Sequence, residues 1–209
     1  VFYDSESDKA IFTEHDGGGS SGDEDVYSYK EKFPEWSYEA DDSVDPVAIS
    51  ADGEYVTAGT GGGDNKVYLF SKDSSTPLWY YSASGAIKSV SISANGKYIV
   101  SGDGSSSGYT RLFDKDSNTP LWSASETNPQ EVSISADGEY IVTCSANEKV
   151  HLFQRNSSTP LWTYTTDGGF SSPMRSCDMS ADGEYIAVGN TEDDNRLYLF
   201  DKDSSTPLW

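Results

Sequence analysis

The 209-residue sequence predicts an all-β protein, a β-propeller of four-stranded antiparallel blades with five repeats of about 43 residues. Three markers that recur in phase carry this prediction. Five tryptophans are spaced by 43, 43, 40 and 47 residues, and the last four end the same Thr-Pro-Leu-Trp sequence. The second marker is a Ser-Ala-Asp-Gly-Glu-Tyr hairpin, which reads Ser-Ala-Asn-Gly-Lys-Tyr in one copy. The third is a triplet that ends in Leu-Phe. The tryptophans are Trp36, Trp79, Trp122, Trp162 and Trp209.

The unit at residues 45–87 shows how each strand is predicted. Its apolar runs are short and alternate with small or polar residues, and no segment carries a helical period. Asp52-Gly53 supplies the left-handed backbone that a tight hairpin needs. Pro77 stands where the outer strand begins, a place where a missing N–H is tolerated. The predicted strands are residues 47–50, 55–59, 66–70 and 78–81.

We expect the whole chain, residues 1–209, to form a single propeller. Its first unit is the most degenerate copy, in which Lys9–Thr13 matches the second strand and Val26–Tyr29 matches the third. The chain begins at Val1 and ends at Trp209 within a repeat, so we expect the natural polypeptide to be longer. Five blades that close a small ring and a part of a larger ring remain alternatives. The predicted units are residues 1–44, 45–87, 88–130, 131–173 and 174–209.

These units resemble WD40-like and PQQ-like (quinoprotein-type) β-propeller repeats over essentially the whole chain. The Ser-Ala-Asp-Gly hairpin is similar to the Ser-Pro-Asp-Gly hairpin of WD40 units. Residues 112–122 resemble the tryptophan-docking motif of PQQ-like blades, Ala-x-Asp-x-x-Thr-Gly-x-x-x-Trp. Asp114 and Asp201 match the Asp of that motif, whereas Ser71 and Gln154 depart from it. The resemblance implies that the tryptophans pack between neighbouring blades.

Departures from the WD40 pattern make the chain a hybrid of the two families. The Gly-His dipeptide of WD40 units is absent, so their polar tetrad is not expected. Phenylalanine stands where WD40 units usually carry tryptophan, at Phe70, Phe113, Phe153 and Phe200. The whole resembles the acidic repeat propellers of archaeal and environmental surface proteins.

Loop lengths predict one uniform and one variable face. The hairpin after the first strand and the turn before the fourth keep their lengths in units two to five, whereas the other two connections vary. In a meander the two variable sets lie at the same end, where binding is expected. The alternative for residues 167–175 is an ordinary Gly-rich loop with one residue in the central channel. The candidate binding residues are Asp64, Asp103, Glu126, Asp167, Phe170, Met174, Arg175, Glu192, Asp193 and Asp194.

Charge and composition exclude several classes of function. The net charge is −21 and the isoelectric point about 4.1, which argues against a nucleic-acid binder. The sequence contains no run of 18 apolar residues, so it predicts no transmembrane segment. Two His and two Cys cannot build most zinc, haem or iron–sulfur sites, and nothing resembles a catalytic triad motif. We therefore expect no catalytic residue and no cofactor.

Calcium is the one cofactor that the sequence leaves open. Acidic runs offer oxygen ligands, of which calcium takes six to eight, but none has EF-hand spacing. The alternative is a solvated acidic face. The weak candidate ligands are Asp16, Asp23, Asp25, Asp41, Asp42 and Asp45.

The two cysteines, Cys144 and Cys177, lie in apolar strand-like runs. Small buried residues are the favoured interpretation. A disulfide is the alternative, because sequence cannot test its geometry.

These observations predict a non-enzymatic propeller scaffold or binding module at the cell surface or outside the cell. Its partner would be a protein or another copy of the chain, with the ligand unknown. The charge of −21 suits a salty setting that screens self-repulsion, so the cytoplasm of a halophilic or marine organism is the alternative location. Two alternatives remain for function: a hydrolase or other enzyme with its site at the channel mouth, and a periplasmic-type assembly factor.

Overall fold

A computed structural model describes residues 2–4, 9–12, 27–29, 35–126, 128–166, 174–190 and 195–209. Every regular element in these residues is a β-strand, so the all-β prediction is confirmed. Among the same residues, no helix is long and apolar enough to cross a membrane. The chain divides into two compact units, Val1–Ser37 and Tyr38–Trp209.

The N-terminal unit contains one three-stranded antiparallel sheet. Its strands are β1 (Phe2–Asp4), β2 (Lys9–Phe12) and β3 (Tyr27–Tyr29), paired in the order β1-β2-β3. β2 and β3 coincide with the segments of the first repeat that match a second and a third strand.

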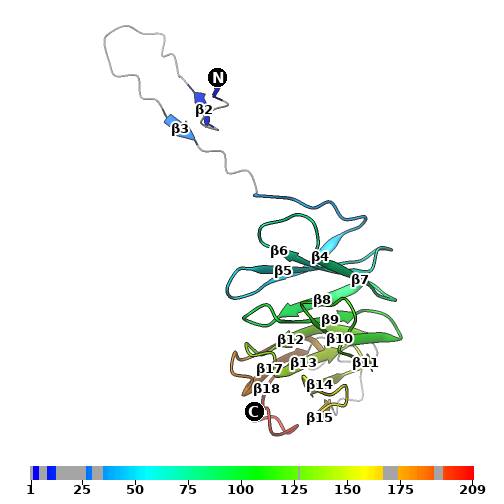
Figure 1. Ribbon diagram of the computed structural model, residues 1–209. Helices are drawn as coiled ribbons and strands as arrows, with labels where there is room; N and C mark the ends of the chain where they lie inside the picture. The colour runs from blue at the N-terminus through cyan, green and yellow to red at the C-terminus, as the bar shows by residue number, and fades with distance from the viewer. Residues whose placement is uncertain are drawn as a thin grey trace. The chain divides into compact units, whose positions relative to one another are not determined.

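The larger unit contains four antiparallel sheets that follow one another in chain order (Figure 1). Each strand pairs with the next one in the sequence, as in the blades of a β-propeller. The first sheet is β4 (Val44–Ile49), β5 (Tyr55–Thr60), β6 (Lys66–Ser71) and β7 (Trp79–Ser82). The second is β8 (Ile87–Ile92), β9 (Tyr98–Asp103), β10 (Gly108–Asp114) and β11 (Trp122–Glu126). The third is β12 (Pro129–Ile134), β13 (Tyr140–Ser145), β14 (Lys149–Gln154) and β15 (Trp162–Thr165). The last described sheet is β16 (Met174–Met179), β17 (Tyr185–Asn190) and β18 (Leu197–Asp201).

The repeated Asp-Gly or Asn-Gly hairpin turns the chain, and in the last three sheets of the larger unit it also packs against the preceding sheet. In the first copy, the Ser50 hydroxyl accepts the Tyr55 N–H at 3.0 Å and donates to Asp52 at 2.5 Å. The glycines of all four copies have φ between 68° and 74°, a conformation that disfavours other residues. A Cβ on Gly138 would lie 2.4 Å from the Tyr98 ring of the preceding sheet. Local turn chemistry and packing therefore require the same residue.

The tryptophans join consecutive sheets through their rings and their indole nitrogens. The Trp122 ring packs against Phe153 of the next sheet, with ring centroids 5.3 Å apart and the planes tilted by 32°, and Phe153 is almost completely buried. The Trp122 Nε1–H donates to the Arg155 carbonyl oxygen at 2.7 Å. The same contacts recur as Trp79 with Phe113 and Lys115, and as Trp162 with Phe200 and Lys202. Each of these half-buried tryptophans thus holds the following blade, as the resemblance to PQQ-like blades implies.

The first and last sheets of this unit present apolar side chains to solvent. On β4, Val47 and Ile49 are 65% and 63% exposed. After β18, Trp209 is 64% exposed, in contrast to the three tryptophans that hold a following sheet. Trp36 falls in the N-terminal unit and is half-buried.

Candidate functional site

Two of the variable loops, β9–β10 and β13–β14, meet the end of β11 and the start of β14 between the second and third sheets of the larger unit. They surround a polar pocket of about 240 Å³. A second hollow of about 200 Å³ shares Ser125, Glu126 and His151 with the pocket and extends between β11 and β14 to Ser158 and Pro160 in the β14–β15 turn. The pocket is lined by Ser106 and Ser107 of the β9–β10 loop, Ser125 and Glu126 of β11, Asn147 of the β13–β14 loop, and Lys149 and His151 of β14. The site is therefore a groove between two blades that opens on the variable face.

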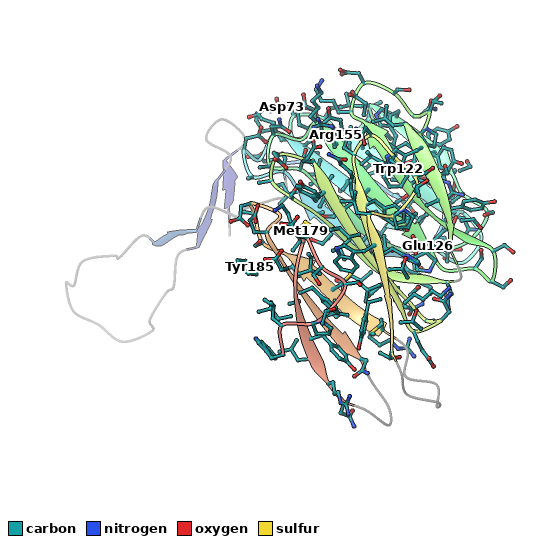
Figure 2. All side chains as sticks on the ribbon, turned by 90° about the horizontal axis from the view of Figure 1, so that it is seen from below. Asp73, Trp122, Glu126, Arg155, Met179 and Tyr185 are labelled. Carbon is teal, nitrogen blue, oxygen red and sulfur yellow. The ribbon has the colours of Figure 1, made fainter. Side chains whose placement is uncertain are left out.

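Glu126 lines this groove and is 7% exposed. It ends β11, whereas Trp122 begins the strand beside Arg155 (Figure 2). Both carboxylate oxygens accept the Thr143 hydroxyl of the next sheet, at 3.0 and 2.9 Å. Burial raises the pKa of Glu126 to about 7, against the opposing hydrogen bonds from Thr143 and Thr110. Glu126 therefore exchanges a proton near neutral pH.

His151 stands on the other wall of the groove and is half-buried. Its Nδ1 lies 2.8 Å from the Thr163 hydroxyl, and its ring lies 5.9 Å from that of Phe153. Burial, followed by the positive charge of Lys149, lowers the pKa of His151 to about 4. A neutral imidazole, a carboxyl group that titrates near pH 7 and one ammonium group thus share the groove, a combination that can donate to and accept from a polar ligand.

Asp103, a candidate binding residue, ties down its own loop. Its side chain is fully buried at the end of β9 and lies 2.6 Å from Arg111 Nη1. The same carboxylate accepts the Tyr109 N–H at 2.7 Å, and the Arg111 guanidinium lies 4.6 Å from the centre of the Tyr109 ring. The Asp103 carboxylate therefore fixes the β9–β10 loop rather than facing solvent.

Asp64 has a similar position in the β5–β6 loop, with a side chain that is 3% exposed. It forms a 2.5 Å ion pair with Lys66 and accepts the hydroxyls of Tyr68 and Thr60 at 2.8 and 3.0 Å. Burial acts to raise the pKa of Asp64, but the hydrogen bonds from Lys66, Tyr68 and Thr60 outweigh it, so the pKa is lowered. The charged carboxylate is thus already occupied by groups of β5 and β6, the two strands that its loop joins.

The remaining described candidates divide between core and surface. Met174 is fully buried in the core cluster of the last two sheets, so it offers no surface contact. Arg175 is exposed, and its Nη1 donates to Gln130 Oε1 in the preceding sheet at 3.0 Å. Five candidates lie outside the described residues: Asp167, Phe170, Glu192, Asp193 and Asp194.

The candidate calcium ligands that the structure describes lie on an exposed segment. Asp42 accepts the Ser43 N–H at 2.7 Å, and Asp41 lies 3.5 Å from Lys66 Nζ. Asp45 is exposed at the start of β4. Across the described parts of the chain, no three His, Cys, Asp or Glu side chains gather as they would around a metal ion. Asp16, Asp23 and Asp25 lie outside those parts.

Lys149, His151 and Asn147 are site residues that the sequence did not single out. Lys149 and His151 alternate on β14, so their side chains share one face of the strand. Two polar residues spaced by two positions directly after a variable loop are the sequence pattern that could have indicated this site. Thr143, the partner of Glu126, carried no comparable signal, because it is one of many hydroxyl residues in the second strands.

Comparisons with known families give two matches. Residues 106–209 match the family described as "Outer membrane protein assembly factor BamB". Residues 75–114 match the family described as "WD domain, G-beta repeat". A comparison with curated proteins finds no match.

The blades and these matches show that the chain is a β-propeller repeat protein, in which tryptophans dock one blade on the next. Within that class, the chain is a WD40-like/PQQ-like repeat protein.

Proposed function

We propose that this chain is a non-enzymatic interaction module that binds a protein partner, or another copy of itself, through its variable-loop face. The observation that carries this proposal is the meeting of two variable loops, β9–β10 and β13–β14, around the polar groove between β11 and β14. The hairpins at the opposite end repeat the same hydrogen bonds in every sheet of the larger unit. Loops that differ on a rigid, repeated scaffold are where specificity resides.

The charge of the chain supports a basic partner and a salty setting. A net charge of −21 attracts cationic surfaces and is tolerated best where salt screens self-repulsion. We place the module at the cell surface or outside the cell, where calcium can also bridge its acidic surface to an acidic partner. An assembly role fits the family that matches residues 106–209, which is described as an assembly factor.

Site-specific photocrosslinking tests which face binds. A crosslinking amino acid at Ser106, exposed in the β9–β10 loop, is compared with one at Thr119, exposed in the β10–β11 turn at the opposite end. In extracts of the source organism, position 106 should capture one recurrent protein, identified by mass spectrometry, that position 119 does not capture. Equal capture at the two positions, or none at position 106, contradicts the proposal.

An enzyme is the second candidate function, favoured by the raised pKa of Glu126 beside a neutral His151. Glu126 is the one carboxyl group among the described residues that line the groove, so the carboxylate pair of a glycoside hydrolase is not assembled there. Glu126→Gln separates the two functions because it keeps the shape of the side chain and removes its proton transfer. Capture through position 106 should survive this change, whereas turnover of a substrate should stop.

A further inference from the structure

Cys144 and Cys177 meet at the junction between the last two sheets of the larger unit. Cys144 lies on β13 and Cys177 on β16, and both thiols are free and buried. The two side chains belong to one core cluster and interact directly. The Cys177 thiol also donates to the Glu131 carbonyl oxygen at 3.5 Å. These are the only cysteines in the sequence.

Comparison among the repeats shows that the two cysteines replace a matched pair of residues. The position of Cys144, four residues after the hairpin tyrosine, is glycine in the other three sheets: Gly59, Gly102 and Gly189. The position of Cys177, three residues before the hairpin serine, is valine in the other three: Val47, Val90 and Val132. Cysteine therefore occupies both of these positions at the junction of the last two sheets, and neither position at the other junctions.

The preceding junction shows how close these two positions are. A Cβ built on Gly102 would lie 3.2 Å from Val132 Cγ1. The Val132 Cγ1 atom occupies the place that a cysteine sulfur would take, so a side chain at the first position lies within contact distance of the second side-chain atom of its partner. This closeness is compatible with a disulfide, which holds its two Cβ atoms about 3.5–4.5 Å apart. Cysteine at both positions places one sulfur against the other.

We propose that Cys144 and Cys177 form a disulfide that covalently joins the β12–β15 sheet to the β16–β18 sheet. A small-molecule disulfide such as oxidised glutathione is a sufficient oxidant. One cysteine thiolate attacks a glutathione sulfur and expels the first glutathione thiolate, which leaves a mixed disulfide. The second cysteine thiolate then attacks the protein sulfur and expels the second. The two protein thiols lose two protons and two electrons, and one oxidised glutathione becomes two reduced molecules.

Burial determines when this bond can form. Cys144 and Cys177 are 0% and 3% exposed, so the oxidant reaches them only when the sheets are apart. Burial, followed by the contact with Cys144, raises the pKa of the Cys177 thiol and makes its reactive thiolate scarce in the folded protein. The disulfide should therefore form during folding, and once formed it should resist reductants.

The test is to refold the full chain with either oxidised or reduced glutathione and to count free thiols in denaturant. After oxidative refolding we expect no free thiol and a peptide map in which Cys144 and Cys177 are linked, two hydrogens lighter than the reduced pair. The cysteines are 33 residues apart, and closing such a loop should raise Tm by roughly 10 °C over the reduced form.

The double variant Cys144→Gly/Cys177→Val is the matched control, because it restores the pair found at the preceding junction. Its Tm should be the same after oxidative and reductive refolding. Two free thiols, separate glutathione adducts or a link between two molecules after oxidative refolding would each overturn the proposal. The thiol count uses the unaltered chain, so the test stands even if the double variant does not fold.

Discussion

The indole nitrogen of Trp122 donates a 2.7 Å hydrogen bond to the carbonyl oxygen of Arg155, 33 residues further along the chain and in the next sheet. The same bond, at the same length, joins Trp79 to Lys115 and Trp162 to Lys202. Because the ring also covers a buried phenylalanine, one side chain supplies both an apolar contact and a directional bond between blades. The recurrent tryptophan therefore sets how each sheet is placed against the next.

Replacing Trp122 by Phe should lower the free energy of unfolding by about 1–2 kcal/mol, since it keeps an aromatic ring but leaves the Arg155 carbonyl without its donor. Trp122→Ala should cost about 3–5 kcal/mol because it also opens a cavity. Urea denaturation measures both. Trp209→Phe is the control, since that ring is 64% exposed, and it should change stability by less than about 0.5 kcal/mol. Equal losses at the two positions would refute this role of Trp122.

A pair of glycines separates packing from backbone strain. Gly53 and Gly138 occupy the same hairpin position and share a φ of 72°. A Cβ at 138 would lie 2.4 Å from the Tyr98 ring, whereas one at 53 meets no atom of the described residues within 4 Å. Both Ala variants should lose about 1 kcal/mol to left-handed strain. Gly138→Ala should lose at least about 1 kcal/mol more, because overpacking moves the ring. Thermal and urea unfolding of the two variants check this difference, and identical stabilities would contradict it.

The strands, the hairpins and the docking tryptophans could be predicted from the sequence because each depends on local, repeated chemistry. Asp52-Gly53 specifies its hairpin within six residues, and the tryptophan recurs at one place in every unit. Repetition turns a weak local signal into a strong one, since four copies must satisfy the same turn and the same packing.

The candidate site was less predictable because its residues occur once and depend on the neighbouring sheet. Asp103 and Glu126 were expected in loops, but each is the last residue of a strand, where one step in register decides whether a side chain is buried. The hydroxyl that Glu126 accepts belongs to Thr143, which lies 17 residues away on the next sheet. Met174 was also expected on the surface. The sequence around it does not reveal that it packs in a core formed by two sheets.

The buried ion pair of Asp103 and Arg111 gives the next prediction. Asp103→Asn should lower the free energy of unfolding by about 3–5 kcal/mol, since it leaves the guanidinium buried without its counter-charge. The third sheet carries Ser145 and His151 at the equivalent positions. The double variant Asp103→Ser/Arg111→His should therefore recover most of that loss. A double variant as unstable as Asp103→Asn in urea denaturation would show that the penalty does not come from the unpaired charge.

Glu126 and His151 should make opposite contributions to the pH dependence of stability. The pKa of Glu126 rises from 4.5 to about 7 on folding, so the folded chain holds the extra proton and stability falls as pH rises through this interval. The pKa of His151 falls from 6.5 to about 4, so stability rises with pH through that interval. Between about pH 4.5 and 6.5 the two effects offset each other.

Glu126→Gln should expose this balance, because glutamine resembles the protonated acid at every pH. At pH 8 the variant should be more stable than the parent, by up to about 3 kcal/mol, since burying the charged carboxylate no longer costs free energy. Below about pH 4.5 the two proteins should be equally stable. Between pH 4.5 and 6.5 the stability of the variant should rise more steeply with pH than that of the parent. Urea denaturation from pH 4 to 8 measures these curves. Glu54→Gln, which removes one exposed carboxylate, controls for the change in net charge. Parallel curves for the parent and Glu126→Gln would show that the groove does not hold a proton at neutral pH.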